Sequence, residues 1–157
     1  MRRRTETTAA ASDLKKHIGF WMRFVSNHVS HAFARKIEAS GVTVAEWVML
    51  REMYDHVEMA PSELAKRSGM TRGAVSKLVD RLVSKELATR REASGDRRFQ
   101  EIALTAAGRK LVPALAALAD ANDEEFFHPL SVCEREALMA TLTKLARAHG
   151  LHRLPTD

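Results

Sequence analysis

The chain has 157 residues, of which 45% are hydrophobic and 29% charged, as expected for one soluble globular domain with its own core. No apolar run approaches the roughly 18 residues of a membrane-spanning helix, and a single cysteine excludes a disulfide framework and a cysteine-based zinc knuckle. The opening segment, MRRRTETTAAASD, has no apolar stretch typical of a secretory signal. We therefore expect a mobile basic tail over residues 1–12 and a cytoplasmic protein.

Basic residues are concentrated in one part of the chain. Residues 66–98 contain ten Lys or Arg and four Asp or Glu, a net charge of +6, while the whole chain carries +5 and the remainder therefore −1. A local basic surface is the electrostatic footprint of a nucleic-acid-binding element. Charge alone is equally consistent with an ordinary solvated surface. The sequence motifs are therefore needed to distinguish such a surface from a nucleic-acid-binding element.

The first predicted helix runs from about residue 13 to residue 39, with apolar residues at helical spacing. Gly41 is a helix-ending residue of the usual kind. Thr43 and Glu46 have the spacing of a capping box, which predicts a second helix that continues to about Asp55.

The segment MAPSELAKRSGMT predicts a short helix, with Pro61 in its first turn and Gly69 at its end. Thr71 caps the next helix, TRGAVSKLVDRLVSKE, which has one apolar stripe. Three cations stand four residues apart along another edge, and such like-charge pairs destabilise an isolated helix by roughly 0.2–0.5 kcal/mol each. These cations are Lys77, Arg81 and Lys85.

After residue 85 the pattern becomes extended. LATRRE and RRFQEIAL flank the turn cluster ASGD, which predicts a hairpin. Thr105 caps a following helix in which we expect a kink at Pro113, and NDEEFFHP predicts a break. A second capping box, Ser131 and Glu134, opens the last helix. Its expected buried side carries Leu138, Leu142 and Leu145.

This order predicts a mainly α fold with a small β-hairpin wing, a winged helix-turn-helix flanked by N- and C-terminal dimerisation helices. We assign residues 41–105 to the DNA-binding lobe and residues 13–40 and 106–157 to the dimerisation helices, as one intertwined domain. The flanking helices carry more apolar surface than so small a lobe can cover. We therefore expect them to bury it against a second copy.

The two helices joined by SGM have the form of a helix-turn-helix, in which the second helix enters the major groove. Small residues, Gly73 and Ser76, allow close approach of the backbone, and Arg72 and Lys77 can donate to guanine acceptors or phosphates. Repulsion along the cationic edge is relieved when phosphates arrive, and released counterions favour binding. The candidate residues in these two helices are Ser62, Thr71, Arg72, Gly73, Ser76, Lys77 and Arg81.

The predicted hairpin tip, SGDRR, supplies the second part of the site. Arg97 and Arg98 are placed to reach the narrow minor groove, whose negative potential attracts arginine. We expect Asp96 to orient a neighbouring arginine through a charge-assisted hydrogen bond. The alternative for Asp96 is a purely local role, because aspartate is common in turns.

The segments VTVAEWVML, PSELAKRSGMTRGAVSKLVDRL, SGDRR and IALTAAGRKL occur in this order between Thr43 and Leu111, and together they resemble the MarR family of bacterial transcriptional regulators. The resemblance implies an obligate dimer, a recognition helix over residues 71–86 and a wing signature on Asp96 and Arg98. It also implies repression relieved by a small, often phenolic or anionic, ligand between the dimer helices and the lobe. Ala60 departs from the family's frequent Ser or Thr cap, a loss of roughly 1 kcal/mol.

Four aromatic residues are candidates for an effector pocket: Trp21, Phe24, His28 and Trp47. Ordinary packing in the core or between copies is the alternative for these side chains.

Evidence for other chemistry is thin. His28 with His31, and His149 with His152, have a spacing that can chelate a metal, but solvated or packed histidines are favoured because no cysteine or matched carboxylate accompanies them. A redox role for Cys133, near the start of the last helix, is disfavoured. No Ser/His/Asp set, glycine-rich phosphate loop or acid pair indicates catalysis. We expect no cofactor or metal.

We therefore interpret the sequence as that of a homodimeric, sequence-specific regulator that binds a pseudo-palindromic site in double-stranded DNA, acts as a repressor and is released by a small aromatic or anionic ligand. The main alternative is a protein-binding module built on the winged fold. Such modules usually lose the basic recognition face, which this chain retains. An enzyme is the third and least favoured class.

Overall fold

The computed structural model describes residues 11–93 and 96–151, with the side chains of 93 and 96–99 left out. Most of the predicted tail, residues 1–10, lies outside this range, as does His152. The elements, in chain order, are the 3-10 turn η1 (Leu14–Lys16), α1 (Ile18–Ile37), the 3-10 turn η2 (Glu38–Ser40), α2 (Val44–Tyr54), α3 (Pro61–Ser68), α4 (Arg72–Ser84), β1 (Ala88–Ala93), β2 (Asp96–Leu104), α5 (Ala106–Phe127) and α6 (Val132–Ala148). The predicted mainly α fold with one hairpin is confirmed.

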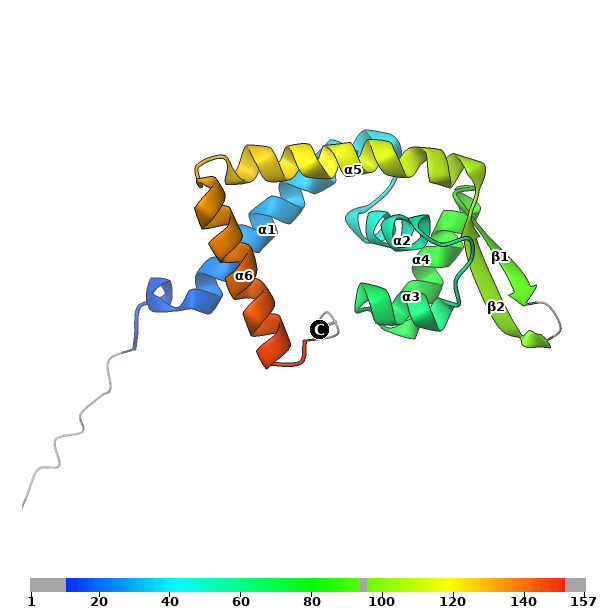
Figure 1. Cartoon of the computed structure of the whole chain (residues 1–157), viewed down its shortest axis with the longest axis horizontal. Coiled ribbons are helices and arrows are strands. Elements are labelled where there is room, and N and C mark those ends of the chain that lie inside the picture. Colours follow the sequence, from blue (N-terminus) through cyan, green and yellow to red (C-terminus); the bar gives the residue numbers. More distant parts are fainter. Residues whose placement is uncertain (1–10, 94–95, 152–157) are drawn as a thin grey trace, which may run out of the picture.

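Helix α5 is the long element that connects the two ends of the molecule (Figure 1). At one end it packs along α1 and turns into α6; at the other it packs on α2 and leads back to the hairpin. Helices α2, α3 and α4 pack on one another beside the hairpin. None of the described helices is both long and apolar enough to cross a membrane.

The predicted helix starts are present as hydrogen-bonded caps. Thr43 Oγ1 accepts from the Glu46 amide at 3.2 Å, and the Thr43 amide donates to Glu46 Oε2 at 2.7 Å, so the first capping box is complete. Thr71 Oγ1 accepts from the Ala74 amide at 3.2 Å at the start of α4. Helix α3 begins after Ala60, which makes no side-chain capping bond.

One hydrophobic core lies under the lobe and extends along α5. The inner face of α4 contributes Val75, Leu78, Val79 and Leu82, and all four are buried. They pack in the same cluster as Leu50 of α2, Leu64 of α3, Ile102 of β2 and Leu115 of α5. The apolar stripe predicted for residues 71–86 is therefore the face that anchors α4 in the core.

The hairpin is antiparallel, with Ala88 opposite Leu104 and Arg90 opposite Ile102. Ile102 also exchanges two backbone hydrogen bonds of 2.9 Å with Met59, in the segment between α2 and α3. This bridge fixes the base of the wing against the lobe.

In the C-terminal half the break is shorter than expected, and within the single chain the apolar side of α6 is exposed. The chain remains helical past Pro113 and through NDEEFF as far as Phe127, so the break is confined to the residues between α5 and α6. No residue of α6 is buried. The residues expected on its buried side, Leu138, Leu142 and Leu145, are each 39% exposed.

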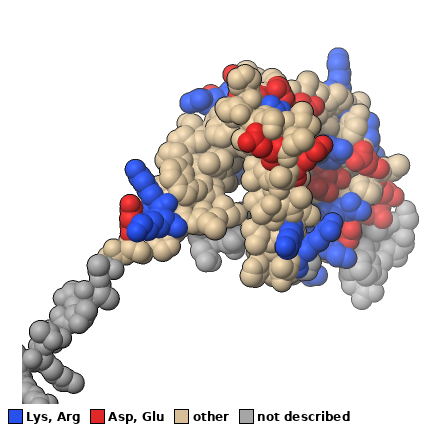
Figure 2. All heavy atoms as spheres, turned by 60° about the vertical axis from the view of Figure 1, so that its left-hand side comes forward, with Lys and Arg blue, Asp and Glu red and all other residues tan. Residues whose placement is uncertain are grey.

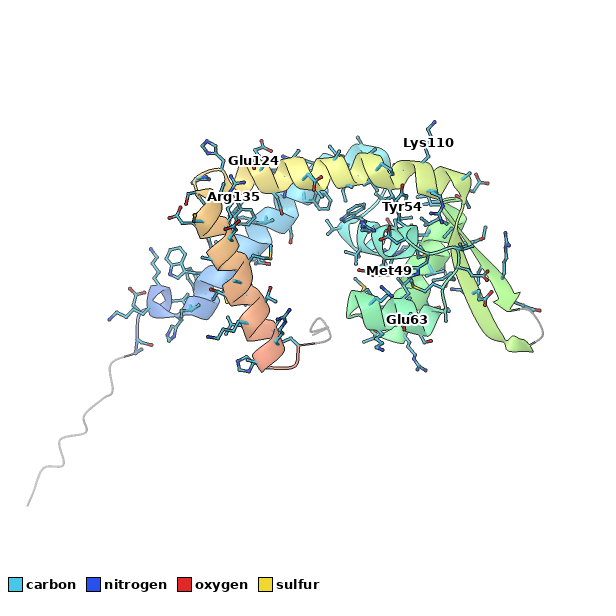
Figure 3. The ribbon with its side chains drawn as sticks, in the orientation of Figure 1. Met49, Tyr54, Glu63, Lys110, Glu124 and Arg135 are labelled. Carbon is cyan, nitrogen blue, oxygen red and sulfur yellow. The ribbon has the colours of Figure 1, made fainter. Side chains whose placement is uncertain are left out.

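The corner between α5 and α6 is held by one arginine (Figure 3). Arg135 donates from Nη1 and Nη2 to the Glu124 carboxylate at 2.5 and 3.1 Å, and from Nε to the carbonyls of Phe127 and Leu130 at 3.1 and 3.2 Å. These bonds tie the start of α6 to the end of α5 and to the short segment between the two helices. The hydrogen bond from Arg135 also lowers the pKa of the Glu124 carboxyl below its ordinary value.

The turn after α4 contains a strained residue. Glu86 has φ 59°, in the left-handed region, at the position after the C-cap where helices commonly place glycine. Glu86→Gly should raise the free energy of unfolding by about 1 kcal/mol, because glycine avoids the steric cost of this conformation at some cost in entropy. Denaturant unfolding at one fixed protein concentration measures this change.

Glu86→Ala is the matched control, since it removes the carboxylate but keeps the Cβ atom that causes the strain. We expect it to give no such gain. Equal stabilisation by glycine and alanine would show that the backbone conformation of residue 86 is not the source of the effect.

Candidate nucleic-acid interface

The predicted recognition residues of α3 and α4 lie on one open surface. Ser62 from α3 and Thr71 and Arg72 from the start of α4 line a shared hollow between the two helices. Along the outer face of α4, the positions that follow are also exposed; they are Gly73, Ser76, Lys77 and Arg81. The structure thus brings together all seven candidates of this half of the site.

Gly73 is not required by packing within the chain. A Cβ atom added there would meet no other atom within 4 Å. The absence of a side chain at this exposed first turn therefore leaves room for something outside the chain. Close approach of a DNA backbone or base edge is consistent with that space.

Lys85 differs from the other two cations of its helix edge. Its Nζ donates to the Gly41 carbonyl at 2.8 Å and to the two carboxylate oxygens of Glu46 at 2.9 and 2.8 Å. The expectation that phosphates relieve repulsion along the whole edge is therefore wrong for this residue, because Lys85 is neutralised within the chain. Lys77 and Arg81 remain as the exposed cations.

Glu46 is the buried partner in this pair, with its side chain 1% exposed. Burial alone would raise the pKa of its carboxyl, but hydrogen bonds from Lys85 and Thr43 and the charge of Lys85 together lower the pKa below its ordinary value. A carboxyl whose pKa is lowered by folding stabilises the fold above its unfolded pKa. That contribution is lost as the pH falls through the folded pKa.

A second ion pair joins α4 to the wing. Arg90 of β1 donates from Nη2 to Asp80 Oδ1 at 3.0 Å. Asp80 is the only acidic residue of α4, so this pair neutralises the one charge on the helix that would repel a phosphate. Sequence reasoning missed both Arg90 and the internal role of Lys85, since nothing local signals a partner many residues away.

The predicted wing residues are described only in part. Asp96, Arg97 and Arg98 begin β2, but their side chains lie outside the described atoms. Gly95, in the predicted tip, falls outside the described residues altogether. The minor-groove role of the two arginines and the orienting role of Asp96 stay predictions.

Three of the four candidate effector residues lie close together on α1. The rings of Trp21 and Phe24 are 6.1 Å apart, and those of Phe24 and His28 are 4.4 Å apart. Trp47 does not make a ring contact with them; it stacks edge-on at 6.3 Å with the buried Phe33 and packs against the core. Trp47 therefore has a packing role in this chain.

A broad uncharged face lies on the side of α1 and α6 (Figure 2). Between α1 and the α5–α6 corner this face is hollowed into an apolar groove. Residues lining the apolar groove include Trp21, Met22, Val25, Phe127, Leu138 and Leu142. A surface of this composition is typical of an interface with another protein chain.

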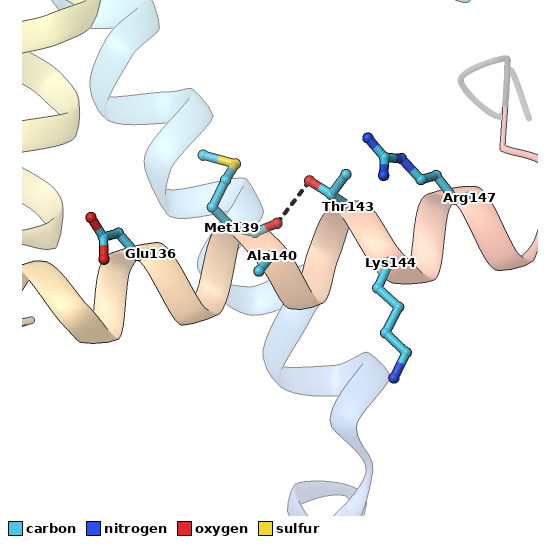
Figure 4. Close-up of a pocket in the computed structure, with 6 residues that line it drawn as sticks. All are labelled: Glu136, Met139, Ala140, Thr143, Lys144 and Arg147. Atoms are coloured by element: carbon cyan, nitrogen blue, oxygen red, sulfur yellow. Dashed lines mark hydrogen bonds between the residues drawn. The ribbon is translucent and has the colours of Figure 1, made fainter.

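Other surface features give no second chemical site. A hollow along α6 is lined by six residues of that one helix, where Thr143 donates to the Met139 carbonyl at 2.8 Å, so it is open helix surface (Figure 4). In the part of the chain that the structure describes, no three His, Cys, Asp or Glu side chains gather as a metal site. His28, His31, His149 and Cys133 are exposed.

Comparison with known proteins agrees with the winged helix-turn-helix arrangement of α3, α4 and the hairpin. A model of the MarR family matches residues 40–98. A probable transcriptional regulator from Pseudomonas aeruginosa superimposes with a TM-score of 0.79 at 27% identity, over 85% of this chain and 99% of that chain. MepR of S. aureus, in a DNA complex, gives 0.78 at 28% identity, over 84% and 98%.

A cysteine-to-serine variant of MarR from E. coli, complexed with operator DNA, gives a TM-score of 0.78 at 25% identity, over 85% of this chain and 99% of that chain. The matched model and these structures are of regulators and not of enzymes, which confirms the expected class. Over residues 40–98 the chain is thus similar to the MarR family, and over most of its length it has the winged helix-turn-helix fold of these transcription regulators.

Proposed function

We propose that the protein is a homodimeric regulator that reads a pseudo-palindromic site in double-stranded DNA with α4 and contacts the flanking minor groove with the wing. The observation that carries this proposal is the two-sided character of α4. Its inner face is buried, while its outer face is open and begins at the hollow shared with α3. The S. aureus MepR and E. coli MarR structures that contain DNA support it.

Electrostatics favour the same partner. Arg72, Lys77 and Arg81 are exposed, and none of them forms an ion pair within the described part of the chain. The one acid on the helix, Asp80, is paired with Arg90. Within the described residues, the three cations on the outer face of α4 therefore have no ion-pair partner, which suits binding to a row of phosphates.

Binding should weaken steeply as salt is added. The cations of α4 and the wing arginines, doubled in a dimer, give on the order of 6–10 phosphate contacts, and each contributes about −0.9 to the slope of log affinity against log salt concentration. Fluorescence anisotropy with a labelled duplex over a salt series measures the slope. A slope shallower than about −3 would overturn the model of two α4 helices and two wings on DNA.

Arg72 should read a base. Arg72→Ala should cost roughly 1–3 kcal/mol at one base position and relax the preference there, as expected when a donor to guanine is lost. Selection of binding sites from random duplexes by the wild type and the variant measures the preference at each position. Arg67→Ala is the control, because Arg67 lies on α3 and pairs with Glu63 of its own helix.

These variants, together with Arg98→Ala, distinguish base-specific reading from sequence-independent attraction to DNA. We expect the Arg67 variant to keep the base preference of the wild type, and Arg98→Ala, at the wing, to weaken binding to all duplexes alike. If Arg72→Ala weakened operator and random DNA equally, Arg72 would be a backbone contact and not a reader.

We propose that the second copy covers the apolar groove and the exposed faces of α1 and α6. Helix α6 has no buried residue in the single chain, and Ile18 of α1 is 77% exposed. Residues 13–40 and 106–157 would then form the dimer helices, and a two-fold arrangement would place the two α4 helices in successive major grooves, about 10 base pairs apart. Such an interface should exceed ~1,000 Å².

Sedimentation at low micromolar concentration should show only dimer. Leu142→Asp, in the apolar groove, should give monomer or unfolded protein, because a charge would be buried at the interface. Ala140→Asp introduces the same charge about 160° round α6 from Leu142 and should remain dimeric. A folded wild-type monomer that binds a half-site tightly would refute the arrangement.

We further propose that the protein acts in the cytoplasm as a repressor that a small aromatic or anionic ligand releases from DNA. The family resemblance and the clustered rings of Trp21, Phe24 and His28 support this ligand class. A promoter carrying the selected site should be silenced by the protein and restored by aromatic carboxylates. Activation by the protein would overturn the repressor role, and failure of every such compound would overturn the proposed ligand class.

A further inference from the structure

One buried carboxylate joins three parts of the chain. Glu46 of α2 accepts from the Thr43 amide at the start of its own helix and from the Lys85 ammonium at the end of α4. The same ammonium donates to the carbonyl of Gly41, the residue that ends the segment following α1. A single cluster of charged hydrogen bonds thus connects the α1–α2 turn, α2 and the recognition helix.

The cluster constrains α4 because a buried carboxylate needs its partners. Glu46 is 1% exposed and Lys85 36% exposed at the side chain, so water can replace the ammonium only in part. Removing one partner from a buried ion pair is strongly unfavourable, since it leaves an uncompensated charge. Rotation or sliding of α4 that carried Lys85 away from Glu46 would therefore be opposed.

Lys85 lies next to the reading face, by which we mean the exposed side of α4 that carries Arg72, Lys77 and Arg81. Lys85 is the C-cap of α4, one turn beyond Arg81, the last of the exposed cations of the reading face. Gly41, with φ 70°, sets the path from α1 into α2. The cluster therefore fixes the reading face relative to the helix that we place in the dimer.

We propose that Lys85 and Glu46 are positioning residues for DNA recognition, which hold the recognition helix to the α1–α2 turn and so transmit the arrangement of the dimer helices to the reading face. This inference rests on the proposed function, in which α4 reads DNA. It assigns Lys85 a role distinct from that of Lys77, which stands two turns earlier on the same edge.

The first experiment compares Lys85→Met with Lys77→Met on a selected operator duplex and on random duplex. Both variants remove one ammonium from the same helix edge and keep an unbranched apolar stem. Lys77→Met should reduce the salt slope by about 1 for each lost phosphate contact, on both duplexes. Lys85→Met should leave the slope on random duplex unchanged and reduce the operator-to-random affinity ratio about tenfold.

Glu46→Gln supplies an independent variant, because glutamine keeps an oxygen that can accept from the Thr43 amide but loses the charge that pairs with Lys85. It should lower the same affinity ratio, and combining it with Lys85→Met should add little further loss, as expected for two partners of one interaction. A salt slope reduced by Lys85→Met as much as by Lys77→Met would make Lys85 a phosphate contact and overturn the proposal. An unchanged affinity ratio in folded Lys85→Met would show a purely structural role and also overturn it.

A second measurement does not need DNA. Spin labels at Ser76→Cys on α4 and Lys110→Cys on α5, in a Cys133→Ser background and diluted with unlabelled protein, report the distance from the reading face to the long helix. Lys85→Met should broaden or shift this distance distribution, while Lys77→Met should not. An unchanged distribution in Lys85→Met would overturn the positioning role, whereas absence of DNA binding with a changed distribution would count against the proposed function alone.

Discussion

Burial of the inner face of α4 is the constraint on which the candidate interface depends. Val75, Val79 and Leu82 are fully buried, and each such side chain contributes roughly 1.5–3 kcal/mol of transfer free energy. Rotating the helix would expose them, so its orientation about its own axis is fixed. With 3.6 residues per turn, the same orientation places Arg72 and Lys77 in solvent. The hydrophobic core thus decides which side chains of α4 face solvent and are available to a partner.

Local chemistry made most of the fold predictable. The hydroxyl caps at Thr43, Thr71 and Ser131 each act within three residues, so the sequence alone contains both donor and acceptor. Gly41 and Gly69 end helices in the left-handed conformation for the same local reason. The exposed strip of α4 was predictable because it is the complement of a helical apolar stripe. Prediction succeeded where cause and effect lie on one element.

The remainder depends on partners far along the chain. Lys85 pairs with Glu46, 39 residues away, and Asp80 pairs with Arg90 across the turn into the wing. Helical spacing places Lys85 on the cationic edge but does not reveal a buried carboxylate beneath it. The exposure of Leu142 in the single chain has a related cause, since no residue of α6 is buried by the described part of the same chain. Apolar periodicity indicates that one face of a helix will be buried, but it does not indicate whether the same chain or a second copy buries it.

Long-range hydrogen bonds at both ends also make α5 a stiff connection between the apolar groove and the lobe formed by residues 41–105. Arg109 donates to the carbonyls of Tyr54 and His56 at 2.7 and 2.9 Å, which fixes the start of α5 to the end of α2, and Arg135 fixes its far end to α6. Helix α5 has 22 residues and is therefore about 33 Å long. Packed helices with discrete anchoring contacts move as units and do not bend continuously. A displacement imposed on α1 or α6 by a second copy or a ligand can therefore reach α4 by two routes: through α2 and the Glu46–Lys85 pair, and through Thr105 at the start of α5, which donates to the Glu86 and Leu87 carbonyls just after α4.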